Sequence, residues 1–260
     1  MSKNIIFCYS GTGNCLDLAK NIAKGLGDTD IVMMRSEPAV TDVYDAETVG
    51  FVFPCYGGGA PADFLKNARK LNVSRKSFVY GISQSASYPG TGLYELNRIV
   101  PLDYWKAVTH QCSCIWLLPH TMMVPPMNAE QAQARSERLA ADIASDVRAH
   151  KIKDKKPRKN PLNAAENKAW GSISVKKAEG FAVSDKCVGC GTCVQLCPRG
   201  NIQLKQGKAV IGTNCAGCLG CLQYCPQGAI SLGAVTDKRE HYHNPNIKAE
   251  DLMEKIIHID

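Results

Sequence analysis

The sequence predicts an α/β fold, a doubly wound parallel sheet of five strands, followed by a small α+β domain. Strand-like and helix-like segments alternate through residues 1–150, which is typical of a parallel sheet with helices on both faces. A basic segment without apolar periodicity follows at 151–177, and we expect a linker there. Two cysteine-rich repeats then occupy residues 178–235, and residues 236–260 form a C-terminal tail.

Apolar runs of strand length recur through residues 1–150, and most of them lead into a helix-like segment. The expected strands are 3–9, 30–34, 48–54, 77–83 and 108–118. The expected helices are 16–26, 62–71, 93–99 and 129–150. The carboxyl ends of parallel strands meet at one edge of a sheet, where ligands of such folds bind. We therefore expect a ligand site built by the loops at 10–15, 54–61 and 83–92.

The first of these loops, SGTGNC at residues 10–15, joins a strand directly to a helix. Such a loop can bind a phosphate through backbone N–H groups, hydroxyl side chains and the positive end of the helix. It lacks the lysine of a Walker P-loop and the spacing of the dinucleotide fingerprint. It resembles the T-x-T-G-N-T phosphate loop of the flavodoxins, which Ser10, Thr12, Gly13 and Asn14 match. The resemblance implies an FMN cofactor held by Ser10, Gly11, Thr12, Gly13, Asn14 and Cys15, with a weaker contact at the thiol of Cys15.

In flavodoxins two further loops grip the isoalloxazine ring, often between aromatic side chains. The segment 54–61 offers Tyr56 and Gly57, and the segment 83–92 offers Tyr88. The resemblance implies that these residues contact the ring, and that the flexible peptide at Gly57 rotates to bond the flavin N5. An ordinary half-buried loop position for either tyrosine stays open at this point.

Eight of the thirteen cysteines fall into two copies of the pattern C-x2-C-x2-C-x3-C-P. This pattern holds the clusters of bacterial two-cluster [4Fe–4S] proteins, and the fourth cysteine of each run ligates the other cluster. Zinc sites usually bring their ligands in two pairs, and disulfides need an oxidising compartment, so both alternatives fit less well. The predicted ligand sets are Cys187, Cys190, Cys193 with Cys225, and Cys215, Cys218, Cys221 with Cys197.

Positive charge is concentrated between the two regions. The segment 148–177 contains ten Lys or Arg and two acids, a net charge of +8 against +7 for the whole chain. A solvated hinge explains this charge, and a docking surface for an acidic partner is the alternative. No nucleic-acid-binding motif accompanies it, and no run approaches the ~18 apolar residues of a membrane span. The sequence therefore predicts neither a nucleic-acid nor a membrane partner.

Two further expectations concern location and the tail. The first apolar stretch is too short for a signal peptide, and the cluster cysteines need a reducing compartment, so we expect a cytoplasmic protein. In the tail, the spacing of Ile247, Leu252, Ile256 and Ile257 predicts a short amphipathic helix within 246–259.

The order of a flavodoxin-like segment, a basic linker and a two-cluster ferredoxin segment resembles the flavodoxin–ferredoxin fusion proteins of anaerobic bacteria and archaea. The resemblance implies electron transfer. We expect an oxidoreductase or electron carrier that passes electrons between two [4Fe–4S] clusters and FMN, and on to a redox protein such as a ferredoxin or a reductase. The alternatives are a reductase that acts on a small molecule or quinone at the FMN, and a redox sensor. The sequence assigns no catalytic residue.

Overall fold

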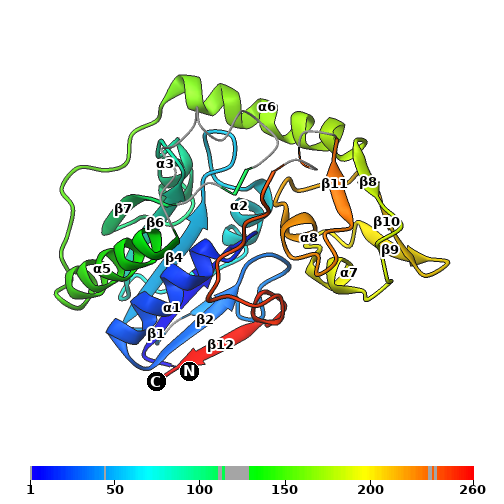
Figure 1. Cartoon of the computed structure of the whole chain (residues 1–260). Helices are drawn as coiled ribbons and strands as arrows, with labels where there is room; N and C mark the ends of the chain where they lie inside the picture. The colour runs from blue at the N-terminus through cyan, green and yellow to red at the C-terminus, as the bar shows by residue number, and fades with distance from the viewer. Residues whose placement is uncertain (1, 44, 111–112, 115–128, 234–235, 237–238) are drawn as a thin grey trace.

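The computed structural model describes residues 2–260 other than 44, 111–112, 115–128, 234–235 and 237–238. Five parallel strands form the centre of its larger part in the order β2-β1-β4-β6-β7 (Figure 1). This is the strand order of flavodoxins, with the switch point between β1 and β4. The prediction of a doubly wound parallel sheet is thus confirmed. The strands are β1 (Asn4–Cys8), β2 (Thr29–Met33), β4 (Thr48–Pro54), β6 (Phe78–Ser85) and β7 (Tyr104–Thr109).

Alternate side chains of β1 point to opposite faces of this sheet. Ile6 and Cys8 pack in the core under helices α1 (Asn14–Leu26) and α5 (Ala129–Arg148). Ile5 and Phe7 pack in the core on the other face, which helices α2 (Ala62–Ala68) and α3 (Gly92–Asn97) cover. Because both faces are buried, β1 reads as a continuous apolar run rather than an alternating one.

The last parallel strand differs from its prediction. β7 begins at Tyr104 and ends at Thr109, whereas the sequence predicted a strand over 108–118. As an edge strand, β7 is only partly buried: Lys106 is half-buried and Ala107 is exposed. Its apolar signal is therefore weak. The stronger apolar run that drove the prediction lies mostly outside the described residues, and the described Cys114 belongs to no strand.

The sheet gains a sixth, antiparallel strand from the tail, β12 (Ile256–Ile259), which pairs with β2. The predicted amphipathic helix within 246–259 was therefore wrong, because only the 3-10 turn η1 (Glu250–Leu252) is helical there. Two physical reasons favour the strand. The run around Ile256 and Ile257 is β-branched, and the outer edge of β2 offers unpaired backbone groups. The short strands β3 (Asp42–Val43) and β5 (Asn72–Val73) pair separately.

The segment expected as a linker contains a helix, α6 (Pro161–Ala178). Asn160 caps it, since its Oδ1 accepts hydrogen bonds from the backbone N–H groups of Leu162 and Asn163 at 3.1 and 3.3 Å. Pro161 occupies the first helical position, where a missing N–H costs nothing. The prolines and charges that predicted a linker therefore mark the start of a helix. In Figure 1, α6 runs along the top of the molecule toward the cysteine-rich part.

The smaller part is the predicted α+β unit, with two antiparallel strand pairs, β9-β10 and β8-β11. Its small core mixes apolar side chains with cysteines. Its elements are β8 (Phe181–Val183), α7 (Thr192–Leu196), β9 (Ile202–Lys205), β10 (Lys208–Ile211), α8 (Gly220–Gln223) and β11 (Ile230–Leu232). Across all the residues that the structure describes, no helix is both long and apolar enough to cross a membrane.

Candidate functional site

The loop at 10–15 lies between β1 and the N-terminus of α1. Gly13 caps α1 with φ +95°, a left-handed conformation that favours glycine. Its N–H donates a hydrogen bond of 3.1 Å to Ser10 Oγ. Cys15, the departure from the flavodoxin pattern, donates through Sγ to Gln84 Oε1 at 3.1 Å, at the end of β6. Burial raises the pKa of the Cys15 thiol well above its ordinary value, so this side chain stays neutral.

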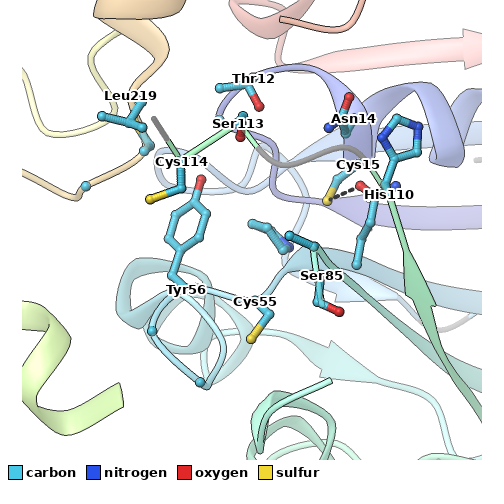
Figure 2. A pocket seen from close by; sticks show the side chains of 18 of the residues that line it. Thr12, Asn14, Cys15, Cys55, Tyr56, Ser85, His110, Ser113, Cys114 and Leu219 are labelled. Atoms are coloured by element: carbon cyan, nitrogen blue, oxygen red, sulfur yellow. Dashed lines mark hydrogen bonds between the residues drawn. The ribbon is translucent and has the colours of Figure 1, made fainter. Parts of the chain in front are cut away.

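A pocket with about 920 Å³ of empty space, part of it open to solvent, begins at this loop (Figure 2). All three loops expected from the sequence contribute to its wall. Every residue that the flavodoxin resemblance implied at the FMN, apart from Gly13, lines it: Ser10, Gly11, Thr12, Asn14, Cys15, Tyr56, Gly57 and Tyr88.

The two tyrosines occupy different depths. Tyr56 is partly buried, and this burial raises the pKa of its phenol well above the ordinary value. Its ring lies edge-on to that of Tyr9, with the centroids 6.2 Å apart. Tyr88 is 38% exposed, and its hydroxyl donates a hydrogen bond of 2.5 Å to Glu166 Oε1 of α6. Tyr56 therefore belongs to the inner wall, whereas Tyr88 belongs to the rim.

Helix α6 lies directly on the glycine loop that follows β4. A Cβ atom added at Gly57 would lie 2.6 Å from the ring of Trp170, and one at Gly58 would lie 2.7 Å from the carbonyl oxygen of Asn163. Asn167 Nδ2 also donates a hydrogen bond of 2.8 Å to Tyr56 O. Because Gly57 and Gly58 have no side chains, α6 can pack directly on this loop. The sequence alone did not predict this packing. The peptide rotation expected at Gly57 stays a prediction.

Two polar side chains that the sequence analysis missed also line the pocket. His110 follows β7 and is 4% exposed, and neither of its ring nitrogens has a hydrogen-bond partner among the described residues. Ser85 Oγ, at the end of β6, is also buried and has no hydrogen-bond partner among the described residues. Burial, with Arg135 adding to it, lowers the pKa of His110 to about 4, so the imidazole is neutral. The carboxyl-end rule identifies His110 once β7 is given its correct bounds.

The first predicted cysteine set surrounds a second, smaller hollow of about 350 Å³ of empty space. Its lining includes all four members, Cys187, Cys190, Cys193 and Cys225. Burial, and then the neighbouring thiols of the same set, raise the pKa of Cys193. Cys225, the fourth cysteine of the second run, therefore lies beside the first three cysteines of the first run, and its role as a cluster ligand stays a prediction. The N–H of Ala229 donates to Cys225 Sγ at 3.2 Å.

The second predicted set is brought together in the same way. Burial, and then the thiols of Cys218, Cys215 and Cys197 together with Cys193 of the first set, raise the pKa of Cys221, and the thiols of Cys218 and Cys197 also act on Cys215. Backbone N–H groups point at two of these sulfurs, from Gly217 to Cys215 Sγ at 3.3 Å and from Asn201 to Cys197 Sγ at 3.2 Å. Within the described residues, no three His, Cys, Asp or Glu side chains lie close enough to hold one metal ion.

Comparison with known proteins agrees with the cysteine geometry. Residues 186–230 match the protein family described as a 4Fe-4S dicluster domain. This part of the chain is a dicluster domain. The match confirms the expectation of 4Fe-4S clusters, and the combination of this domain with a sheet of flavodoxin order confirms the expected fusion architecture. No curated protein matches the chain.

Several solved structures are similar to part of the chain. The Flv1 flavodiiron core from Synechocystis sp. PCC6803 is 16% identical over 57% of this chain and 36% of its own, with a TM-score of 0.40. Rubredoxin oxygen:oxidoreductase from Desulfovibrio gigas is 13% identical over 58% of this chain and 37% of its own, with a TM-score of 0.39. The Trp repressor binding protein of Bacillus subtilis is 17% identical over 52% of this chain and 98% of its own, with a TM-score of 0.30. The chain spans little more than a third of the first two, and the fold assignment rests on the strand order.

The dicluster domain forms part of the pocket wall. Gly217, Cys218 and Leu219 line the same cavity as the flavodoxin-like loops, and Figure 2 shows Leu219 at its edge. A Cβ at Gly11 would lie 2.5 Å from Cys218 O and would also meet the Tyr56 hydroxyl, so only glycine fits between them. We call Cys197, Cys215, Cys218 and Cys221 the inner set, because Cys218 borders this pocket. The outer set is Cys187, Cys190, Cys193 and Cys225.

An ion pair between two partly buried side chains, Arg199 and Asp63, joins the dicluster domain to α2. Arg199, two residues after Cys197, donates from Nε and Nη2 to the two carboxylate oxygens of Asp63 in α2, at 2.8 and 3.1 Å. Its Nη1 donates to Cys215 O at 2.9 Å. A two-pronged contact of this kind constrains orientation as well as distance. It holds the inner set against the flavodoxin-like part of the molecule.

Proposed function

We propose that this chain passes electrons within one molecule between two [4Fe–4S] clusters and FMN, and exchanges them with a redox protein. The observation that carries the proposal is the shared pocket wall. Cys218 of the inner set and Tyr56 of the expected flavin loop both flank Gly11 and line one cavity. Joining the two sites in one chain makes their encounter intramolecular, at high effective concentration.

The pocket suits FMN in three respects. The N-terminus of α1, capped by Gly13, offers backbone N–H groups to a phosphate. Ser10 and Thr12 are nearly buried and line the pocket beside those groups. Ser85 Oγ and His110 have no partners among the described residues and provide polar atoms for a bound ligand. FMN would supply one- and two-electron chemistry at this site, next to clusters that exchange single electrons.

We assign the inner and outer cysteine sets as the ligands of one cluster each. The pairing of thiols across the two runs supports this assignment. The outer set faces the surface, since Cys190 is exposed and Val188 beside it is 65% exposed. Lys205 on the adjacent hairpin is exposed and adds positive charge, which favours an acidic redox protein such as a ferredoxin as the partner. Electrons would enter or leave the chain at this end.

A matched pair of cysteine variants tests the proposal. Protein purified without oxygen is assayed for flavin, iron and sulfide, and electron exchange between clusters and flavin is followed by stopped-flow absorbance. Cys218→Ser alters the inner set at the pocket wall, and we expect it to slow exchange with the flavin at least tenfold. Cys190→Ser alters the outer set, and we expect it to slow reduction by an external ferredoxin instead.

Two results would contradict the proposal: protein with both clusters but no flavin, or equal cluster–flavin exchange rates in Cys218→Ser and the wild type. The same preparation separates the reductase alternative. Steady turnover of a quinone with reduced ferredoxin, without any second acceptor protein, would favour a reductase acting at the same pocket. Turnover only when an acceptor protein is present would favour the electron carrier.

A further inference from the structure

A buried arginine lies where the two parts of the molecule meet. Arg35 follows β2 and is 6% exposed. Its Nη2 donates to Leu196 O, and its Nη1 donates to Leu252 O at 3.3 Å. Both acceptors are neutral carbonyls, and its Nε has no partner among the described residues. No carboxylate in the described part of the chain forms an ion pair with it, although a buried charge normally requires a counter-charge.

The guanidinium lies against the backbone that carries the inner set. Leu196, whose carbonyl it binds, directly precedes Cys197. A Cβ at Gly220 would lie 3.5 Å from Nη2 of Arg35, and Gly220 directly precedes Cys221. Two inner-set cysteines, one from each run, are thus anchored next to the same cation.

The other described cations near the cysteine sets either have anionic partners or, like Lys186 and Lys205, are exposed to solvent. Arg199 is paired with Asp63 at 2.8 Å. Lys208, whose charge is felt at Cys187 of the outer set, is paired with Asp185 at 2.5 Å, and both are exposed to solvent. Among the described residues that contact either set, Arg35 is therefore the buried cation without a carboxylate partner.

We propose that Arg35 is the counter-ion of the inner cluster and raises its reduction potential above that of the outer cluster. The inference rests on the cluster assignment in the proposed function. A cubane with four thiolate ligands is anionic, and it gains one more negative charge when it is reduced. A nearby buried cation stabilises that charge, and net charge is one of the factors that set cluster potentials. With both clusters bound, the charge of Arg35 would favour an electron on the inner set, which borders the pocket, over one on the outer set, and this transfer would make or break no bond.

Anaerobic redox titration of the holoprotein, followed by EPR and visible absorbance, tests this ordering. The variants are Arg35→Gln, which removes the charge, and Arg35→Lys, which keeps it. Arg138→Gln, on the exposed face of α5, is the matched control. In Arg35→Gln we expect the reduction potential of one of the two clusters to fall by about 59 mV or more. For a one-electron couple, this shift is a tenfold change in the equilibrium constant for reduction. In Arg35→Lys and Arg138→Gln both potentials stay at their wild-type values.

Iron and sulfide content decides cases in which a variant does not hold both clusters. If Arg35→Gln holds only one cluster and Arg35→Lys holds both, the positive charge at this position is needed, and the result supports the counter-ion role. Loss from both variants assigns Arg35 a packing role and overturns the proposal, as do unchanged potentials in Arg35→Gln with both clusters present. Failure here is distinct from failure of the proposed function, because wild-type electron exchange between clusters and flavin is measured independently of Arg35.

Discussion

The hydroxyl of Tyr242 donates a hydrogen bond of 2.9 Å to Oδ1 of Asn14. Two more contacts join the same segments: Asn244 N–H donates to Thr12 O at 2.8 Å, and Asn244 Nδ2 donates to Asn14 Oδ1 at 3.3 Å. The chain that leaves the dicluster domain therefore runs over the loop at 10–15, the expected phosphate loop, before it forms β12. The order of this loop depends on residues more than 200 positions away along the sequence.

Removing the Tyr242 hydroxyl should weaken FMN binding. Tyr242→Phe keeps the ring and loses the hydrogen bond that orients Asn14, an interaction with a net worth of about 1 kcal/mol. We expect the dissociation constant for FMN to rise about fivefold, as measured by fluorescence titration of the flavin-stripped protein. Tyr94→Phe, in α3 and outside the pocket lining, is the control. An unchanged affinity in Tyr242→Phe would show that the tail does not organise the loop.

The Arg199–Asp63 pair should couple the dicluster domain to α2. Each side chain is about one-quarter exposed, so the pair is screened less than a surface salt bridge and its two hydrogen bonds restrict its geometry. We expect Asp63→Asn and Arg199→Gln each to lower the thermal midpoint by about 2–4 °C, the shift that about 1 kcal/mol produces in a chain of this size.

A double-mutant cycle checks that the effect belongs to the pair. In the double variant the loss should be clearly smaller than the sum of the two single losses, because each single change already removes the contact. Strict additivity would mean that the two side chains act independently. Electron exchange with the flavin, measured in the same variants, should slow together with the loss of stability.

Local signals predicted most of the sheet and the ligand chemistry. Four of the five parallel strands follow from buried apolar runs such as that of β1, whereas the weakly apolar β7 was misplaced. The placement of Cys225 beside the first cysteine run follows from the spacing pattern. Contacts between distant segments were not predictable in this way. Trp170 on Gly57, Arg35 against Leu196 and Ile257 beside Ile31 depend on how separate elements dock. A helical period in the tail gave the wrong element because the open edge of β2 was not visible in the sequence.

A side chain at Gly57 should displace α6. Gly57 has φ +50°, and an added Cβ would lie 2.6 Å from the Trp170 ring. We expect Gly57→Ala to lower the thermal midpoint by several degrees and to expose Trp170, shifting its fluorescence to longer wavelength. Adding Trp170→Leu should recover part of the stability, since space is restored while the backbone strain remains. If the second change recovers nothing, the glycine is required by its backbone conformation alone.

His110 should make the protein less stable in weak acid. Its pKa is lowered to about 4 from 6.5 in the folded chain, so between these values the unfolded chain binds the extra proton. Stability therefore falls as the pH drops from 6.5 toward 4, by about 1 kcal/mol at pH 5.5. We expect the thermal midpoint of the wild type to fall between pH 7.5 and 5.5 by about 2–4 °C more than that of His110→Gln.

His258 provides a control of opposite sign. Hydrogen bonds to Asp30 and Asp260 raise its pKa above 6.5, so its contribution is fully present below that value and is lost as the pH rises through the folded pKa. His258→Gln should therefore lose more stability at pH 5.5 than at pH 7.5, whereas His110→Gln should lose less. Identical pH profiles for His110→Gln and the wild type would mean that His110 titrates normally, and that the polar end of the pocket is hydrated rather than shielded.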